Sequence, residues 1–234
     1  MKYAIECYNM TKNYGKIVAL KNFSVKVKEG ECFGLFGPNG AGKSTAISIL
    51  STLISPTMGK VRIKGFDIAT QSKKVKLSVS AMFQDLTLDD SLTGRENLKL
   101  YKVLKKSENS IEDVLELIEL GERIDDPVKT YSYGMKRRLE IARCLLVKSP
   151  VIFLDEPTRD LDTEIRRKIL YYMKDMKRKN TLFIATHSIH EAKFLCDKVG
   201  LISNGVLLNV CGVKKLKKNV DQYLGKNFEV DAFA

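Results

Sequence analysis

The feature that most constrains this chain is a glycine-rich segment at residues 37–45. The segment follows the spacing G-x-x-x-x-G-K-[ST] and reads Gly37-Pro38-Asn39-Gly40-Ala41-Gly42-Lys43-Ser44-Thr45. A short, mostly apolar run precedes it at 31–36, and the helical spacing of Ala46, Leu50 and Leu53 follows it. This order of strand, glycine loop and helix is the one that the motif needs. The sequence therefore predicts a phosphate-binding loop and a nucleoside triphosphate as its ligand.

Each residue type in the loop has a physical reason to be there. Glycines bring backbone N–H groups close to phosphate oxygens, and the N-terminus of the following helix adds its partial positive charge. Lys43 can reach the terminal phosphates, and the Ser44 hydroxyl can ligate a phosphate-bound Mg²⁺. The alternative is an ordinary glycine-rich turn. Because Lys43 and Ser44 are both in register between two suitable flanks, we prefer the phosphate-binding loop.

The length and composition are those of a packed globular protein. The 234 residues suffice for one large α/β domain with an inserted subdomain, and 44% of them are hydrophobic. No apolar run approaches the ~20 residues that cross a membrane, and the alternating N-terminus does not resemble a signal peptide. Five scattered cysteines, an odd number without a C-x-x-C pair, predict reduced thiols in a cytosolic protein.

The chain is basic, with a formal net charge of +12. A basic surface can face nucleic acid, an anionic membrane or simply water. The charge is uneven, because residues 107–126 hold eight carboxylates and a single basic residue, Arg123. The aromatic-plus-basic pattern of a nucleic-acid reader is missing. We therefore expect a solvated surface and no nucleic-acid partner.

The N-terminal and middle parts of the chain have different hydrophobic patterns. Alternating apolar residues predict antiparallel strands within 2–30, with a turn at Lys12-Asn13-Tyr14-Gly15 between them. Residues 86–148 instead have helical spacing, and Gly121 is expected to end one of the helices. Thr93 with Glu96 three residues later forms a capping-box pattern. A helical block of this length between strands predicts an inserted helical subdomain.

Two runs in the second half, the wholly apolar 151–154 and the mostly apolar 181–185, predict buried strands, the first as a central strand of a parallel sheet. The first run ends in Asp155-Glu156 and the second in Thr186-His187. Ligands bind at the carboxyl ends of such strands. Asp155 therefore suits a second metal contact, Glu156 a general base, and His187 faces the same crevice. The alternative for an isolated histidine is a purely structural residue.

Local signals also mark the ends of the remaining elements. Asp162 is expected to cap a helix, and Ser188 with Glu191 to form a capping box before the next one. Asn204-Gly205 between two apolar runs is a strong hairpin signal. The segment at about 212–234 is a lysine-rich tail without a clear pattern.

Taken together, these motifs resemble those of the ATP-binding subunit of ABC transporters, over roughly residues 2–215. The resemblance implies that Gln84 ligates Mg²⁺ and meets the membrane domain, and that His187 is the switch histidine. It also implies that Ser132 and Gly134, in Tyr131-Ser132-Tyr133-Gly134-Met135, contact ATP bound to the opposite protomer. Asp162 corresponds to the dimer-contact loop, Glu156 to the catalytic glutamate, and Tyr14 to the aromatic residue that stacks on adenine.

The sequence departs from the family pattern at three positions. Tyr133 stands in place of the usual first glycine of the signature, Met135 in place of its glutamine, and Asp160 in place of a glycine before Leu161-Asp162. The form Y-S-x-G-M-[KR]-R-R, with Leu92-Thr93-Gly94-Arg95-Glu96-Asn97-Leu98, is similar to the daunorubicin-resistance branch of exporters.

The expected fold is thus an α/β P-loop NTPase: a RecA-like parallel core, an N-terminal antiparallel β-subdomain and a helical insert at about 86–148. We expect one ABC ATPase domain over 1–234 that hydrolyses ATP with Mg²⁺ as a head-to-tail dimer. Its partner would be an integral-membrane permease, which would hold this subunit at the cytoplasmic face of the cell membrane, with export as the direction. One alternative is a soluble ABC ATPase that acts on ribosomes or nucleic acid, and another is an inactive regulatory cassette.

Overall fold

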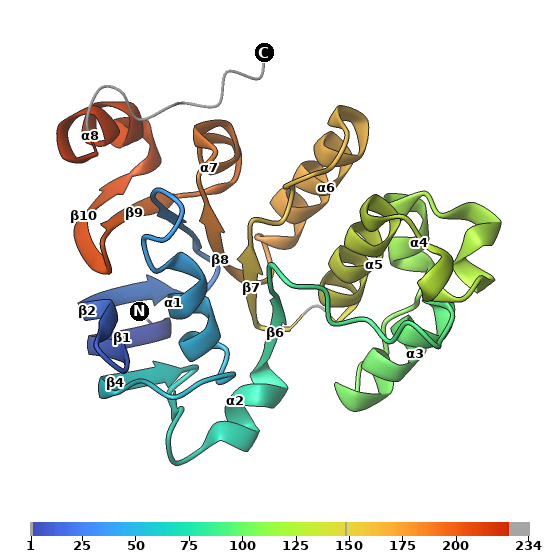
Figure 1. Cartoon of the computed structure of the whole chain (residues 1–234), viewed down its shortest axis with the longest axis horizontal. Coiled ribbons are helices and arrows are strands. Elements are labelled where there is room, and N and C mark those ends of the chain that lie inside the picture. Colours follow the sequence, from blue (N-terminus) through green and yellow to red (C-terminus); the bar gives the residue numbers. More distant parts are fainter. Residues whose placement is uncertain (1, 148, 225–234) are drawn as a thin grey trace.

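The computed structural model describes residues 2–147 and 149–224. The described chain forms a small antiparallel sheet and a larger, mostly parallel sheet that share a core (Figure 1). The small sheet has the strand order β2-β1-β4-β5. Its strands are β1 Tyr3–Tyr14, β2 Ile17–Lys28, β4 Met58–Ile63 and β5 Phe66–Asp67. All of its pairs are antiparallel, which confirms the predicted N-terminal β-subdomain.

The turn between β1 and β2 is shorter than predicted. Tyr14 pairs with Ile17, so that Gly15 and Lys16 alone form the turn, and Lys12 and Asn13 belong to β1. Gly15 has a φ of 58°, a conformation that glycine adopts without steric cost. The extended hydrogen-bonded ladder therefore continues up to the one residue that allows a tight reversal.

The large sheet has the strand order β10-β9-β3-β8-β7-β6. Its strands are β3 Cys32–Phe36, β6 Val79–Met82, β7 Val151–Asp155, β8 Thr181–Thr186, β9 Lys198–Ser203 and β10 Val206–Gly212. All pairs are parallel except β9 with β10. This pair forms the predicted hairpin, in which Asn204 and Gly205 both have positive φ, 47° and 76°. The parallel core is the one expected of a P-loop NTPase.

The register of the parallel strands brings the candidate residues to one edge. Phe36 pairs with Thr186 and Asp155 pairs with Ala185. The chain leaves β3, β7 and β8 at the same level, just before the glycine loop, Glu156 and His187. Thus three separate sequence motifs emerge side by side at the carboxyl edge of the sheet.

Helices and the small sheet cover both faces of the large sheet. Phe33 and Phe153 point into a core shared with the small sheet and with helix α1 (Lys43–Leu50). Alternate residues such as Ile152 and Leu154 point into a second core on the other face. Helix α2 (Ser72–Ser78) packs on the first core, and α6 (Thr163–Met176), α7 (Ile189–Leu195) and α8 (Leu216–Tyr223) pack on the second. Burial on both faces explains why the central strands β3, β7 and β8 are mostly apolar.

The predicted helical subdomain lies between β6 and β7, beside the sheet (Figure 1). Its elements are α3 Gly94–Leu104, α4 Glu112–Ile118, the 3-10 turns Gly121–Asp125 and Val128–Thr130, and α5 Tyr133–Leu146. Thr93 accepts a hydrogen bond from the Glu96 N–H, and the Glu96 carboxylate accepts one from the Thr93 N–H, which confirms the capping box. The Ser132 hydroxyl caps α5 in the same manner by accepting from the Met135 N–H.

Three local predictions need correction. Helix α4 ends at Ile118 because Glu119 takes the left-handed conformation, with φ 46°, while Gly121 opens the next 3-10 turn. Glu191 does not complete a capping box with Ser188, since its carboxyl turns into the core toward Thr158. The predicted tail contains a 3-10 turn, Val213–Lys215, and helix α8; its last ten residues, 225–234, lie outside the described residues.

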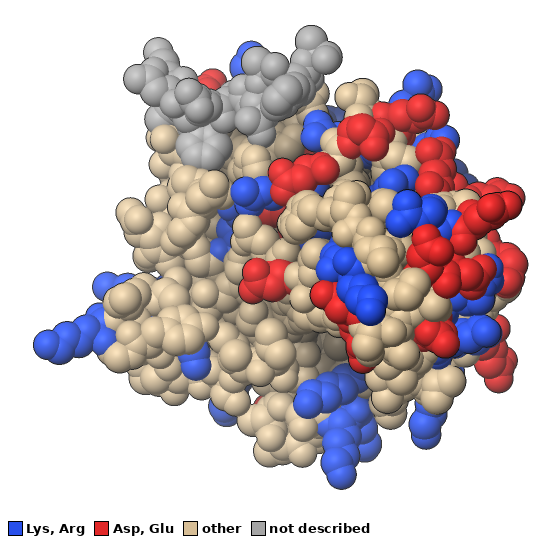
Figure 2. All heavy atoms as spheres, turned by 45° about the vertical axis from the view of Figure 1, so that its right-hand side comes forward, with Lys and Arg blue, Asp and Glu red and all other residues tan. Residues whose placement is uncertain are grey.

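The surface charge of the insert agrees with the uneven charge of the sequence. Figure 2 shows carboxylates crowded over the insert where it is turned toward the viewer. The exposed ones are Glu108, Glu112, Asp113, Glu116, Glu119, Glu122 and Asp125. Among the described helices, none combines the length and the hydropathy needed to span a bilayer.

Candidate active site

The glycine loop is held tightly against neighbouring backbone. A side chain on Gly37 would place its Cβ 2.1 Å from the carbonyl oxygen of Ile202. Gly42, with φ 101°, would meet the carbonyl oxygen of Ala19 at 2.6 Å. Only glycine fits at these two positions, because a Cβ would collide with backbone that cannot yield. The loop therefore has one preset course into α1.

Lys43 begins α1 and is buried, with 6% of its surface exposed. Its Nζ donates hydrogen bonds to the carbonyl oxygens of Gly37, at 2.7 Å, and Pro38, at 3.1 Å. The ammonium thus lies inside the loop, where a terminal phosphate would meet it. This is the place that the sequence motif predicts for the lysine.

Asp155, the last residue of β7, is 1% exposed. Burial raises the pKa of its carboxyl above the usual range, and the nearby Ser44 hydroxyl offsets part of this rise. Within the described residues, no donor forms a well-oriented hydrogen bond with either carboxylate oxygen, so the Ser44 hydroxyl stabilises the charge only in part. Ser44, Gln84 and Asp155 line one cavity together with the glycine loop. A hard cation fits these oxygen donors, because it would satisfy the buried Asp155 carboxylate.

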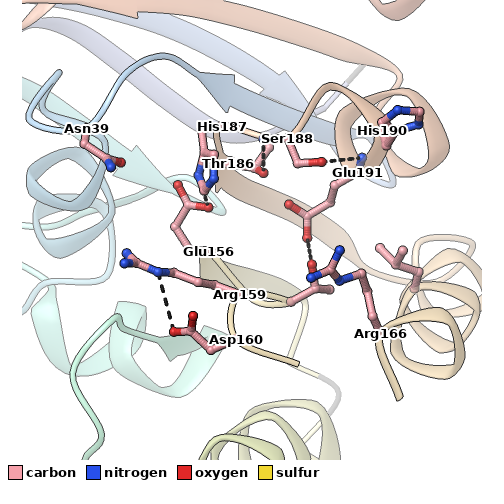
Figure 3. A pocket seen from close by; sticks show the side chains of 12 residues that line it. Asn39, Glu156, Arg159, Asp160, Arg166, Thr186, His187, Ser188, His190 and Glu191 are labelled. Atoms are coloured by element: carbon pink, nitrogen blue, oxygen red, sulfur yellow. Dashed lines mark hydrogen bonds and ion pairs between the residues drawn. The ribbon is translucent and has the colours of Figure 1, made fainter. Parts of the chain in front are cut away.

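Glu156 lies between two basic side chains. Its Oε2 is 2.8 Å from Nδ1 of His187, and its Oε1 is 3.4 Å from Nζ of Lys43. Figure 3 shows the Glu156 and His187 side chains pointing toward each other from neighbouring strand ends. The backbone of Glu156 has a φ of 50°, uncommon for a residue with a side chain. Glu156 lines the same cavity as the glycine loop.

The cavity at the glycine loop has a volume of about 620 Å³. Ile17, Val18 and Ala19 of β2 form part of its wall, a contribution that the sequence motifs did not indicate. Ile17 is 70% exposed, the highest value among the large apolar strand residues that are described, and its exposure is not apparent from the sequence. Tyr14 is not among the lining residues; it lies across the turn from Ile17, half-exposed beneath the Lys12 ammonium, 5.1 Å from the ring centre.

A second cavity, of about 380 Å³, lies behind Glu156 and His187 (Figure 3). Glu191 closes its inner wall and is 4% exposed. The Thr158 hydroxyl donates to Glu191 Oε1 at 3.2 Å. Burial raises the pKa of Glu191 to about 7, although hydrogen bonds from Thr186 and Thr158 oppose the rise. Sequence reasoning placed Glu191 at a helix cap and missed this position.

Five predicted site residues are not among those that line the two cavities: Tyr14, Gly37, Ser132, Gly134 and Asp162. Ser132 is exposed at the N-terminus of α5, followed by half-buried Gly134. Asp162 caps α6 by accepting from the Ile165 N–H at 2.9 Å. Asp160, the departure from the family pattern, has a φ of 60° and so reproduces a backbone conformation typical of glycine. The chain alone therefore does not bring Ser132 or Gly134 to its own glycine loop.

Comparison with known proteins agrees with this arrangement. The family model described as "ABC transporter" matches residues 20–159. The linearmycin resistance ATP-binding protein of Bacillus subtilis is 36% identical over 212 residues, which are 88% of this chain and 68% of that protein. An uncharacterised ABC transporter ATP-binding protein of the same organism is 34% identical over 99% of this chain and 76% of its own length. This chain spans only 25% of ABC transporter A family member 12 of Arabidopsis thaliana, at 37% identity.

Solved structures give the same result for the fold. A dimeric ATP-binding cassette in a post-hydrolysis state, bound to ADP and Pi, superposes with a TM-score of 0.81 at 29% identity. The match covers 89% of this chain and 98% of that one. The ATP-binding subunit of an ABC transporter has a TM-score of 0.85 at 25% identity, over 96% of this chain and 95% of its own.

Proposed function

Because the chain belongs to the ABC transporter ATP-binding family, we propose that it hydrolyses ATP to drive a separate membrane permease. The observation that carries this proposal is the position of Glu156, 3.4 Å from Lys43 and 2.8 Å from His187 at the edge of the sheet. A carboxylate placed between a phosphate-binding lysine and a histidine suits a base that activates water for attack on a phosphate.

Each residue of the site has a proposed role in that reaction. The backbone N–H groups of 37–45 bind the phosphates, and Lys43 neutralises the terminal one. Ser44, Gln84 and Asp155 would hold Mg²⁺, which neutralises charge on the phosphates when it is bound. Glu156 orients and deprotonates the attacking water, and His187 holds the Glu156 carboxylate in place. Tyr14 would stack on the adenine after a small movement of the turn at Gly15.

The complete site would need two chains. Ser132 and Gly134 are accessible at the start of α5 but lie outside the cavity of their own glycine loop. In a head-to-tail dimer they would reach the γ-phosphate held by the partner, with Asp162 at the contact. Two of the solved neighbours are described as dimeric cassettes, which supports this assembly.

A cleft between the sheet and the insert supports a membrane partner. It has a volume of about 340 Å³, and Phe83, next to Gln84, contributes to its wall. Lys76, Lys105 and Arg143 make it basic. Leu53 of its wall is 62% exposed, and the segments that carry the lining residues Lys76, Tyr101 and Lys105 have further exposed apolar side chains: Leu77, Leu100, Val103 and Leu104. We propose that a cytoplasmic segment of the permease with apolar and acidic side chains binds here, which would place this subunit at the inner face of the membrane.

Export is the proposed direction of transport. The support comes from the signature form Tyr131-Ser132-Tyr133-Gly134-Met135 and from a relative that is described as a resistance protein. Resistance to a toxic compound is consistent with its removal from the cell. The transported compound would be selected by the permease.

Mixing two inactive variants tests the proposed function. Lys43→Ala removes the phosphate contact of the glycine loop in its own chain. Ser132→Arg blocks the segment that would contact the ATP bound to the partner chain. If each ATP site is built from both chains, a mixed dimer has both substitutions in one site and neither substitution in the other site. With random pairing about half of the dimers are mixed, so up to about a quarter of all sites should be intact.

The measurement is steady-state ATP hydrolysis of each variant alone and of the equal mixture. Activity that returns on mixing supports the shared site. A mixture no more active than the sum of its parts, together with a wild-type specific activity that does not change on dilution, would exclude it.

A further inference from the structure

Arg137 is the largest fully buried side chain of the described molecule, with 1% of its surface exposed. It lies on α5, shortly after the capping Ser132. Burial lowers the pKa of its guanidinium, although the group keeps its charge at neutral pH. Placing a charge in the interior is costly unless polar groups surround it, so a buried charge beside a functional cleft is a candidate for a role in that site.

The guanidinium joins the ends of two neighbouring strands. Its Nη1 donates to the carbonyl oxygens of Phe83, at 3.0 Å, and Gln84, at 3.3 Å, just after β6. Its Nη2 donates to the carbonyl oxygens of Asp155, at 3.1 Å, and Glu156, at 2.6 Å, at the end of β7. One planar group therefore ties together the backbone of two proposed metal ligands, Gln84 and Asp155, and of the proposed base.

The contact to Glu156 fixes an unusual backbone conformation. Glu156 has a φ of 50°, and its N–H donates to the carbonyl oxygen of Ala185 at 2.9 Å. Its own carbonyl oxygen accepts from Arg137 at 2.6 Å and, at 3.2 Å, from the Arg159 N–H. The peptide groups on both sides of the Glu156 Cα are thus held, which sets where the carboxylate points. Loss of the Arg137 contact would leave this carbonyl with the longer Arg159 bond alone and would let the strained residue relax.

We propose that Arg137 is a positioning residue that sets the backbone of Gln84 and Glu156. We further infer, resting on the proposed dimer, that it links this catalytic edge to the Ser132–Gly134 segment that meets the partner's ATP. Helix α5 carries both ends of the link. A shift of its N-terminus on closure would move the guanidinium, and with it the carbonyls that it binds.

The neighbouring Arg138 provides a matched control. It lies on the same helix and also donates to two carbonyl oxygens, those of Ile118 at 2.9 Å and Glu119 at 3.2 Å. These lie at the end of α4 in the insert and not at the catalytic edge. Lysine at either position keeps the charge. At position 137, however, a single ammonium cannot span the two pairs of carbonyl oxygens that the guanidinium contacts.

The first experiment compares Arg137→Lys with Arg138→Lys. We expect kcat of Arg137→Lys to fall about 10- to 100-fold, as for other small displacements of catalytic groups. Its Kd for ATP should stay within about twofold of wild type, because the loop is untouched, and Arg138→Lys should keep kcat within about twofold. An equal fall of kcat in both variants, or a weaker Kd with an unchanged kcat in Arg137→Lys, would overturn the proposal.

Thermal melting checks that each variant is folded. Where Arg137→Lys does not fold, Arg137→Gln takes its place, because it removes the buried charge and keeps two N–H donors for one pair of carbonyls. The same split between kcat and Kd is expected of this variant. A folded Arg137→Gln with wild-type kcat contradicts the positioning role.

The second experiment tests on which site Arg137 acts. Mixed with Ser132→Arg, the Arg137→Lys chain should regain activity as the Lys43→Ala and Ser132→Arg pair does, because both faults fall in one site. Mixed with Lys43→Ala it should regain none, because each site then has one fault. Recovery with Lys43→Ala and none with Ser132→Arg would mean that Arg137 acts on the ATP site of the partner chain. That result would overturn the proposed positioning of Gln84 and Glu156 within its own chain. Failure of the reference pair, with a wild-type specific activity that does not change on dilution, would exclude the shared site, whereas the kcat comparison would still decide the positioning role.

Discussion

The carboxyl edge of the large sheet and the helical insert use charge in opposite ways. At the sheet edge, Lys43, Asp155 and Glu156 are at most 6% exposed and lie close together. On the insert most charges face water, and ion pairs such as Arg95 with Asp125 have side chains that are 30% and 60% exposed. Water and salt weaken the electrostatic interactions of the exposed charges on the insert. The buried charges at the sheet edge interact more strongly, because their surroundings are less polar.

This difference separates two tasks within one domain. The sheet edge holds a few charges in fixed positions. The backbone of Glu156 is strained there, and the packing of the surrounding strands offsets the energy of that strain. The insert presents a surface that can adapt to other chains at small cost. We therefore expect chemistry to be sensitive to single atoms at the edge, and recognition to depend on the insert as a whole.

The largest effect is expected from Glu156→Gln. The amide keeps the shape of the side chain but cannot accept a proton from water, so kcat should fall by roughly 10²-fold or more while ATP still binds. Glu116→Gln, a change of the same chemistry on the exposed face of the insert, should leave kcat unchanged. Steady-state ATP hydrolysis measures both. Near wild-type turnover in Glu156→Gln would remove this residue from the role of base.

A second comparison uses one buried glutamate from each region, Glu140 of the insert and Glu191 near the sheet edge. Glu140 of the insert is 0% exposed and accepts from Arg143 and from the Thr87 hydroxyl, the latter at 2.9 Å. Glu140→Gln should lower the free energy of unfolding by about 1–3 kcal/mol, because it removes the partner of a mostly buried charge. Chemical denaturation at several pH values between 6 and 8 should show this loss throughout.

Glu191→Gln should behave differently. The pKa of Glu191 in the folded protein is about 7, above its ordinary 4.5. The folded state therefore binds this proton more tightly, and the stability that the proton contributes is present below pH 4.5 and lost as the pH rises to about 7. An amide does not titrate, so the free energy of unfolding of the variant should gain roughly 2–3 kcal/mol relative to wild type as the pH rises through this window. A difference that stays constant with pH would contradict the raised pKa.

Tyr14 should give a smaller effect on the nucleotide side. Tyr14→Ala should weaken ATP binding by about 0.5–1.5 kcal/mol, by analogy with aromatic pairs, and Tyr14→Phe should be nearly silent. Tyr8→Ala is the control, since Tyr8 is a similarly exposed tyrosine of the same strand. Calorimetry measures the affinities. Equal affinities for wild type and Tyr14→Ala would make Tyr14 a packing residue only.

The smallest effect is expected from the surface of the insert. Asp125→Asn breaks the ion pair with Arg95, whose Nε lies 2.7 Å from Asp125 Oδ1. The thermal midpoint should change by at most about 2 °C at low salt, and the change should vanish near 1 M salt. A large shift that persists in salt would mean that this region, too, depends on fixed charges.

Local sequence patterns predicted the parts of the fold that depend on neighbouring residues. The glycine loop, the capping box at Thr93 and the hairpin at Asn204-Gly205 are each determined by a few adjacent side chains. The apolar runs before Asp155 and His187 placed both residues correctly at one edge, because parallel strands align their carboxyl ends.

The missed features depend on contacts between distant residues. Arg137 lies 54 residues from Phe83 and 19 from Glu156 in the sequence, and no local pattern indicates these contacts. The same holds for Ile17 in the cavity wall and for the carboxyl of Glu191, which packs against Thr158. A lysine-rich composition concealed helix α8, whose Leu216 and Val220 are the buried residues that fix it to the core.

The order of the strands has a consequence for the synthesis of the chain. Strand β3, which leads into the glycine loop, pairs with β8 and β9, so that Cys32 meets Leu182 and Phe33 meets Lys198. A ribosome that adds about 5–20 residues per second needs on the order of 10 seconds to make the intervening segment. During that time the backbone N–H and C=O groups at both edges of β3, and its apolar side chains, lack the strands that cover them in the folded protein. The nascent chain is therefore exposed to aggregation at this point, and we expect its yield in cells to depend on chaperones that bind apolar strands.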